Sequence, residues 1–552
     1  MGKLTRRRVL AAPLAALALG ACGQRGDKAA GKQPAILLRG NGPDPDSLDP
    51  HKARANEAMV VLRDLFEGLT RLDKNAATVP AAAESWSVSD DGRVYTFKLR
   101  PNLRWSSGEP LVAEDFAAGL RRLVDPVTAS QYAQVVDVIL NAPDIVAGKK
   151  PVDSLGVAAP DTQTFVITLS NPAPYLPGLM AHPSTAPLHR PSFEKFGERF
   201  ARPGDQVSNG AFVLTEWLQG SYIRTARNTH YWNNASNKLD GVKFLQITDE
   251  NAELRAYRAG ELHSTRAVPR GQFGWIKENL SAELHIAPQI STYYYGFNLD
   301  RQLFGNPKLR QALSMAIDRE LLASSVLRVG ELPAYGWVPP GMNNYGSQAF
   351  EYATTPAAER IEIARKLLAE AGYTREKPLR FELQFNSGEV HTKVAVAVSS
   401  MWKEALGVEA RLAAVEFKSL FDAIDRREVD MYRLSWVGDY NDPYTFLQYL
   451  KGGFGINLPH YANASYDALL EEASHQTDVA ARRALLEKAE RTMLADHPLI
   501  PLYFYVNKHL VKPELQGWYD NVMDVVYSQD LELASSPMSL REDAPTTPHP
   551  GV

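Results

Sequence analysis

The chain has 552 residues, of which 45% are hydrophobic and 22% are charged, and its formal net charge is −4 at pH 7. These values are ordinary for a soluble globular protein, and the length exceeds what one hydrophobic core usually serves, so we expect two or three lobes. A mildly acidic chain without a basic block is a poor candidate for binding nucleic acid, and a single cysteine excludes an intramolecular disulfide.

The first residues are typical of an export signal. Lys3 and the arginines at 6–8 precede an apolar run at 9–19, and small residues lead up to Cys22. This pattern indicates a secretory signal peptide, and the apolar run is shorter than the about 20 residues that cross a bilayer. Leu19 and the small residues before Cys22 resemble a bacterial lipoprotein signal, which predicts cleavage after residue 21 and lipid attachment to Cys22. The alternative is a free core cysteine.

Lipid attachment implies that the protein is anchored to a membrane surface and does not cross it. Loss of a leader with four basic and no acidic residues changes the net charge from −4 to −8. Export would follow the Sec route or, because TRRRVL at 5–10 resembles a twin-arginine signal, the Tat route. The small and charged residues at 22–35 predict a flexible tether, and the proline-rich residues at 534–552 predict a disordered tail.

Between these ends, strand and helix patterns are mixed. Apolar residues alternate with polar ones at 95–99, 165–169 and 379–385, which predicts half-buried strands. Apolar faces with helical spacing predict helices at 357–371 and 479–495. A chain of this length with both kinds of element is expected to be a multi-lobed α/β protein.

Enzyme signatures are absent from the sequence. There is no nucleophile elbow, zinc-protease motif, phosphate-binding loop or dinucleotide fingerprint, so we expect no enzyme activity, cofactor or metal. Asp44, Asp46 and Asp49 loosely suggest a calcium loop, but the required glycine and glutamate are missing, which favours ordinary turns. A lipid-anchored peptidase would need an activated nucleophile or a metal and is therefore disfavoured.

Aromatic residues gather in three segments, at 293–295, 436–449 and 503–505. Most of these residues are expected to be core strands. The segment 436–443 is different, because glycine, aspartate, asparagine and proline indicate a turn that combines two aromatic rings with two carboxylates. Such a turn is suited to holding a cation and an apolar group together.

A set of motifs in this order resembles the oligopeptide-binding proteins of bacterial ABC importers, which form family 5 of the solute-binding proteins. The resemblance runs from about residue 37 to about residue 531. Its motifs are SLDPH at 47–51, RDLFEGL at 63–69, WSSGEP at 105–110, SNGAF at 208–212, NTHYW at 228–232, the segment 310–319 that ends in AIDR, and DYNDP at 439–443.

The resemblance implies an α/β fold of the periplasmic-binding-protein type (class II), in which two lobes close around a ligand at a hinge. The expected core of the first lobe comprises 36–66, 191–292 and 507–533, an extra subdomain comprises 67–190, and the second lobe comprises 293–506. It further implies a monomer that captures oligopeptides and delivers them to the importer's permease subunits and their ATPases. A selective receptor for murein-derived or other specialised peptides is the alternative, and a folding or adhesion role is a third.

The resemblance also implies a set of ligand-binding residues. Asp439 would bind the peptide's ammonium group and Arg433 its carboxylate; a turn aspartate and a solvated ion pair are the respective alternatives. Asn386 and His391 would line the far end of the site, although a surface role is the default for a histidine like His391. The remaining expected site residues are the aromatics Tyr132, Tyr294, Trp436, Tyr440 and Tyr505, together with Asn209 and Gly210.

Three positions depart from the family pattern. Arg54 stands where relatives can carry a glutamate, Ile424 replaces an arginine, and Leu327 falls near a lysine position. These positions would influence ligand length and charge, and Arg54 suggests a preference for acidic ligand side chains.

Overall fold

The computed structural model describes residues 34–342, 345–438, 440–454 and 457–534. The predicted signal peptide, Cys22, almost all of the tether and the tail from 535 lie outside these ranges, as does Asp439. The described residues from Ala35 onward belong to one compact unit. No helix among them is both long and apolar enough to pass through a bilayer.

The N-terminal strand belongs to a four-stranded sheet in which it pairs with a strand about 200 residues later in the chain. β1 is parallel to β10, and Leu37, Val242 and Phe244 from this pair are fully buried. Helix α1 (Asn56–Leu65) buries Ala58, Val61 and Leu62. The order of strands is β1 (Ile36–Gly40), β10 (Gly241–Leu245), β9 (Tyr222–Arg227) and β8 (Phe212–Leu218).

A second four-stranded sheet contains the strands predicted at 95–99 and 165–169. The alternation of apolar residues is confirmed, because Tyr95, Phe97 and Leu99 are buried and Phe97 pairs with Phe165. The order is β4 (Ala83–Val88), β5 (Val94–Leu99), β7 (Thr164–Thr168) and β6 (Val157–Ala158), with the hairpin β2 (Thr70–Leu72) and β3 (Thr78–Pro80) before it. The accompanying helices are α2 (Ala113–Val124), α3 (Ala142–Val146), α4 (Leu176–Leu179) and α5 (Arg190–Phe196).

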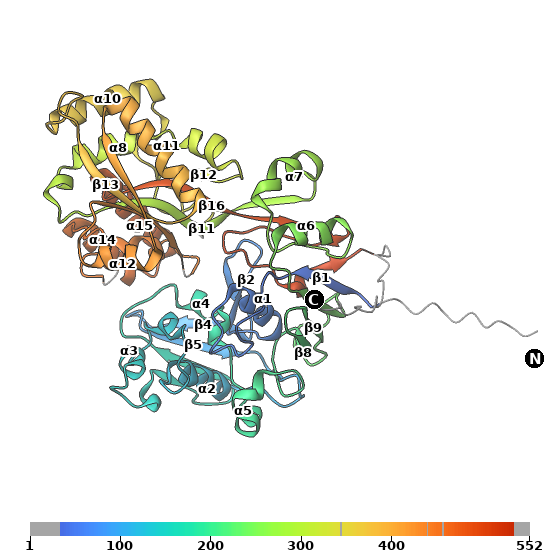
Figure 1. Ribbon diagram of the computed structural model, residues 1–552. Coiled ribbons are helices and arrows are strands. Elements are labelled where there is room, and N and C mark those ends of the chain that lie inside the picture. The colour runs from blue at the N-terminus through green and yellow to red at the C-terminus, as the bar shows by residue number, and fades with distance from the viewer. Residues whose placement is uncertain (1–33, 343–344, 439, 455–456, 535–552) are drawn as a thin grey trace, which may run out of the picture. The chain divides into compact units, whose positions relative to one another are not determined.

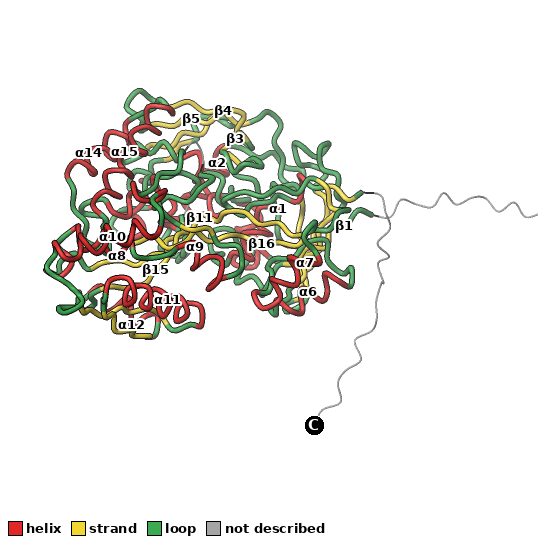
Figure 2. The backbone as a smooth tube through the Cα atoms, turned by 90° about the horizontal axis from the view of Figure 1, so that it is seen from above, coloured by secondary structure: helices red, strands yellow, loops and turns green. Residues whose placement is uncertain are grey.

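The largest sheet has six strands and helices on both faces. Helix α11 lies on one side and α14 and α15 lie on the other (Figures 1 and 2). Its order is β12 (Leu332–Pro333), β16 (Leu499–Leu510), β11 (Leu284–Phe297), β15 (Met431–Val437), β13 (Arg380–Asn386) and β14 (Glu409–Val415). The helices are α8 (Pro307–Met315), α9 (Arg319–Leu321), α10 (Ala357–Glu370), α11 (Glu389–Leu406), α12 (Phe417–Asp425), α13 (Tyr444–Leu447), α14 (Ala464–His475) and α15 (Val479–Asp496).

The helices predicted at 357–371 and 479–495 are therefore confirmed as α10 and α15, and the strand predicted at 379–385 is confirmed as β13. The Asp478 side chain accepts a hydrogen bond from the amide of Ala481 and so caps α15, as the sequence predicts.

Two long strands, β11 and β16, extend from the six-stranded sheet toward α6 (Glu250–Arg258) and α7 (Phe273–Asn279) (Figure 1). Their pairing is interrupted between Pro288 and Thr292. Within the gap, the amide of Ile290 donates instead to the carbonyl of Val522, at 2.9 Å. A short antiparallel pair near the end of the described residues joins β17 (Leu515–Gln516) to β18 (Glu532–Leu533).

Candidate functional site

Strand β15 carries two of the expected site residues, Arg433 and Trp436. Because side chains alternate along a strand, these two residues project from opposite faces of the sheet. The strand is followed by the turn that the sequence singled out. The candidate site therefore has three parts. They are the face of the sheet from which Arg433 projects (the Arg433 face), the opposite face (the Trp436 face) and the turn after β15.

On its face of the sheet, Arg433 brings together several predicted residues. Its guanidinium donates to Oδ1 of Asn386 at 2.8 Å and to the hydroxyl of Tyr505 at 2.9 Å. It also lies over the ring of Tyr293, 4.2 Å from the centroid. The hydroxyl of Tyr293 lies 3.4 Å from Nδ1 of His391. Arg433, Asn386, His391 and Tyr505 thus form one cluster, with Tyr293 at its centre.

This cluster holds a buried cation that has no anionic partner in the described part of the chain. Arg433 is only 5% exposed, its Nε has no hydrogen-bond partner, and its hydrogen bonds all go to neutral groups among the described residues. Burial, and then the charge of Arg433, lower the pKa of His391 to about 4, so that this imidazole is neutral at pH 7. Because an uncompensated buried charge costs several kcal/mol, the arrangement is suited to receiving a carboxylate.

The Trp436 face is mainly a packed core. The indole of Trp436 donates to the carbonyl of Thr445 at 2.9 Å and lies 4.8 Å from the ring of Tyr449. Tyr294 lies in this core, where its hydroxyl is 2.6 Å from that of Tyr449 and its ring meets Trp337 edge-on. Tyr293, the preceding residue, lies beside Arg433 instead.

The turn after β15 contacts the segments that surround the second sheet. Tyr440 is buried and stacks on Tyr175, with centroids 4.4 Å apart and planes at 10°. Asn441 donates to the carbonyl of Ala76 at 2.7 Å. Asp442 is bound by two guanidinium nitrogens of Arg482, at 2.6 and 2.9 Å, so its charge is neutralised.

A cavity of about 280 Å³ lies beside this turn. Its walls are largely aromatic and apolar, which is typical of a small-ligand site. Tyr132 lies behind one wall, where its ring is 5.1 Å from that of His182. The charged, polar and aromatic side chains that line the cavity include Arg63, Trp86, Tyr175, His182, Tyr440 and Asp442.

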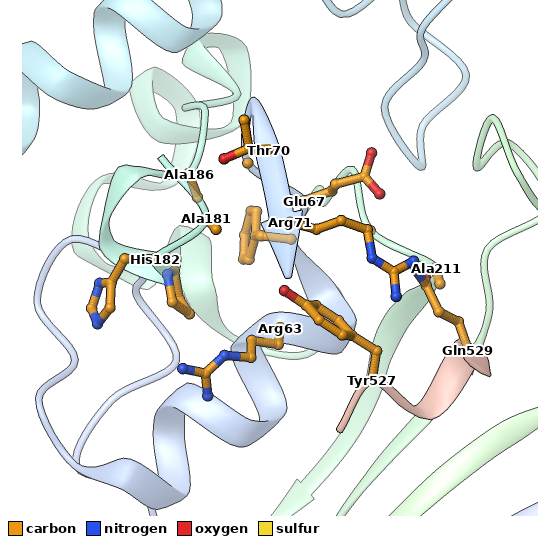
Figure 3. Close-up of a pocket in the computed structure, with 14 residues that line it drawn as sticks. Arg63, Glu67, Thr70, Arg71, Ala181, His182, Ala186, Ala211, Tyr527 and Gln529 are labelled. Atoms are coloured by element: carbon orange, nitrogen blue, oxygen red, sulfur yellow. The ribbon is translucent and has the colours of Figure 1, made fainter. Parts of the chain in front are cut away.

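Asn209 and Gly210 hold the backbone that follows α1. Asn209 accepts a hydrogen bond from the amide of Glu67 and donates one to its carbonyl, at 3.1 and 2.8 Å. The amide of Gly210 donates to the carbonyl of Leu65, and a β-carbon at 210 would lie 2.5 Å from the carbonyl carbon of Leu65. Gly210 also lines a cavity of about 10 Å³, which has room for a single water (Figure 3).

The positions that depart from the family pattern do not meet at one site. Arg54 has a side chain that is 66% exposed and lies 3.6 Å from Asp46. Ile424 and Leu327 are buried apolar residues.

The three early aspartates are each bound by protein groups. Asp44 accepts from the indole of Trp217, Asp46 accepts from the amides of Arg54 and Ala55, and Asp49 pairs with Arg122. The described residues contain no group of three or more acidic, histidine or cysteine side chains that could hold a metal.

The sequence did not single out Arg63, His182 and Tyr175, which line the cavity, or Tyr293, which lies beside Arg433. Arg63 stands within the quoted 63–69 motif, which was the available signal. His182 and Tyr175 come from a segment without a distinctive pattern, and only the fold brings them to the turn after β15.

Comparison with known proteins identifies the family. The family described as "Bacterial extracellular solute-binding proteins, family 5 Middle" matches residues 77–457. The chain belongs to this family.

Individual relatives match along almost the whole chain. The periplasmic oligopeptide-binding protein OppA of Escherichia coli is 38% identical over 539 residues, which cover 96% of this chain and 99% of the relative. The probable deoxycholate-binding periplasmic protein YgiS of the same organism is 39% identical over 499 residues, covering 90% and 93%. The solved structure of the periplasmic murein tripeptide binding protein MppA, in its unliganded open form, has a TM-score of 0.87 and 37% identity and covers 91% and 98%.

Proposed function

We propose that this protein is an extracytoplasmic receptor that captures oligopeptides and delivers them to an ABC importer. The proposal rests mainly on Arg433. Its guanidinium is buried, its Nε has no hydrogen-bond partner, and it has no anionic partner among the described residues. A peptide carboxylate would neutralise this charge. The similarity to the oligopeptide-binding protein of E. coli supports the same ligand class.

In this proposal the ligand is held by its ends. Arg433 binds the carboxylate, with Asn386, His391 and Tyr505 around it. Asp439, in the turn after β15, binds the ammonium group. Trp436, Tyr440 and Tyr132 contribute aromatic surface near the ligand, Tyr294 supports the sheet from its core side, and Asn209 and Gly210 position the segment after α1.

Capture would occur by closure of two lobes, with 36–66, 191–292 and 507–533 as the core of the first, 67–190 as its extra subdomain and 293–506 as the second. The interrupted pairing of β11 and β16 near Pro288 is the position where we expect the hinge. Closure would enclose the ligand and create the surface that the permease recognises.

We further propose that the mature protein is a monomer without enzyme activity, exported by the Sec or Tat route and held at a membrane by lipid on Cys22. The basic and apolar leader supports export, and the cysteine at its end supports lipidation.

Two narrower ligand classes are alternatives. The similarity to MppA supports murein-derived peptides, and the similarity to YgiS supports a bile acid, whose carboxylate would also suit Arg433. The largely apolar 280 Å³ cavity is the specific observation that favours an apolar ligand.

Calorimetry with a soluble form that lacks residues 1–22 tests these possibilities. We expect tri-alanine and longer peptides to bind without being cleaved, and Asp439→Asn to weaken their binding by a few kcal/mol because the ammonium loses its partner. Deoxycholate has no ammonium, so its binding should not respond to this substitution. N-acetylated tri-alanine and the exposed-site variant Asp90→Asn are the controls. Unchanged peptide affinity in Asp439→Asn would contradict the site assignment, and new peptide fragments would contradict the receptor.

A further inference from the structure

Arg63 is a second cation that faces a cavity and has no counter-ion among the residues that the structure describes. It lies in the last turn of α1 and lines both the 10 Å³ cavity and the 280 Å³ cavity. Figure 3 shows its guanidinium turned away from Glu67 and Arg71, on the side of His182. None of the described residues forms a hydrogen bond or ion pair with it.

The neighbouring carboxylates are already bound to other groups. Asp442 is held by Arg482, and Glu67 accepts from Tyr231 and from the indole of Trp232. Asp524, whose negative charge acts on Arg63, pairs with Arg266 at 2.7 Å and with His509 at 2.6 Å. The described part of the chain therefore provides no carboxylate for Arg63.

The surroundings of Arg63 strengthen the attraction for an anion. Burial, and then the charge of Arg63, lower the pKa of His182 to about 3, so this ring is neutral at pH 7 and adds no second charge. Trp86, Tyr175 and Tyr440 line the same cavity. An ion pair formed between such walls is stronger than one on the surface, because the effective dielectric constant is lower.

We propose that Arg63 binds the carboxylate of an acidic side chain in the captured peptide, so that the preferred ligands carry an acid in addition to their C-terminal carboxylate. This inference rests on the proposed function. The cavity also includes Tyr440 and Asn441, the residues directly after Asp439, and the acidic side chain therefore belongs near the amino end of the ligand. Arg433 remains the partner of the C-terminal carboxylate.

The sequence suggested Arg54 as the source of a preference for acidic ligand side chains. Its surroundings differ from those of Arg63. It is largely exposed and lies 3.6 Å from Asp46, and it is not among the residues that line the cavity. Exposed pairs of this kind contribute little to affinity, because water and salt screen them.

The test compares peptides that differ only in one charge. Ala-Glu-Ala is measured against Ala-Gln-Ala, and Asp-Ala-Ala against Asn-Ala-Ala, by calorimetry with the form lacking residues 1–22. The wild-type protein should bind the acidic member of at least one pair about tenfold more tightly, the size expected for a charged hydrogen bond. Arg63→Gln should remove this preference and leave the affinity for tri-alanine within about threefold of the wild type.

Three further variants make the result specific. Arg54→Gln and the exposed-turn variant Arg93→Gln should keep the full preference, and Arg63→Lys should keep part of it. Thermal unfolding of each variant establishes that it is folded.

Several outcomes would overturn the inference: no acidic preference in the wild type, a preference that survives Arg63→Gln, a preference lost in Arg54→Gln, or an equal loss for acidic and neutral peptides. Binding of tri-alanine separates the two proposals. If tri-alanine binds and the acidic and neutral members of each peptide pair bind with equal affinity, the proposed receptor function is supported and the proposed role of Arg63 is wrong. If no peptide binds, both fall.

Discussion

At the scale of single residues, two arginines differ from the other basic groups around the site in lacking an anion. Arg71 is paired with Asp530 and Arg482 with Asp442, whereas Arg433 and Arg63 have no anionic partner among the described residues. Because Arg433 is buried and Arg63 is half-buried, a missing partner is costly, and we propose that a ligand supplies the missing charge.

Arg433→Gln is expected to weaken binding of a free-acid peptide by about 2–5 kcal/mol, because the buried carboxylate loses its charged partner. The same peptide with a C-terminal amide should bind wild type and variant almost equally. The matched control is Arg426→Gln, on an exposed residue that pairs with Glu428. A loss of the same size for the acid and the amide would show that Arg433 acts only through packing.

At the scale of elements, the site depends on a close backbone contact between α1 and the segment before β8. Gly210 makes this contact possible, because any side chain at 210 would collide with the carbonyl groups of Asp64 and Leu65. The same contact fixes the end of α1, where Arg63 lies.

Gly210→Ala is expected to lower the free energy of unfolding by roughly 1–3 kcal/mol, the usual cost of overpacking. Gly274→Ala is the matched control, because Gly274 lies within α7 and a β-carbon added there would have no heavy atom within 4 Å apart from its chain neighbours and the backbone of its own helix. That substitution should raise stability by about 0.5–1 kcal/mol. Urea unfolding measures both changes, and equal effects would contradict the packing argument.

At the scale of the whole molecule, buried acids connect stability to pH. Burial raises the pKa of Glu490 from 4.5 to about 7 and that of Asp64 from 3.8 to about 6. Glu490 accepts hydrogen bonds from the amides of Trp337 and Val338 and from the hydroxyl of Tyr345. These two carboxyl groups therefore bind protons more tightly in the folded protein than in the unfolded chain, and their contribution to the free energy of unfolding falls as the pH rises from about 4.5 to about 7.

Glu490→Gln should reduce this decrease, because a neutral amide has no proton to lose. Urea midpoints at several pH values between 4.5 and 8 measure the slope, and the exposed residue Glu472, changed to glutamine, provides the control. A slope identical to that of the wild type would show that Glu490 does not titrate in this range.

Anchoring is also a property of the whole molecule. Cys22→Ser should release the protein from membranes, because the lipid has no sulfur to which it can attach, and should leave peptide affinity unchanged. Fractionation of cells and calorimetry on the purified variant measure the two effects. Retention of the serine variant on membranes would contradict lipidation at Cys22.

Local patterns in the sequence were sufficient to predict several elements, and they nominated part of the candidate site. Alternation at 95–99 predicted β5, helical spacing predicted α10 and α15, and the residue types of β15 and its turn indicated where charge and aromatic surface would meet. These features depend on neighbours within a few residues, so the sequence alone contains them.

The sequence by itself predicted an export signal, and it determined the single cysteine, the α/β character and Arg433 as a candidate cation. Only the tertiary structure decided that Arg433 has no anionic partner among the described residues, that Tyr293 rather than Tyr294 lies beside it, and that Arg63 faces a cavity together with Tyr440. The reason is physical. Charge compensation and strand register depend on groups hundreds of residues apart in the chain, and no local pattern records which of them come into contact.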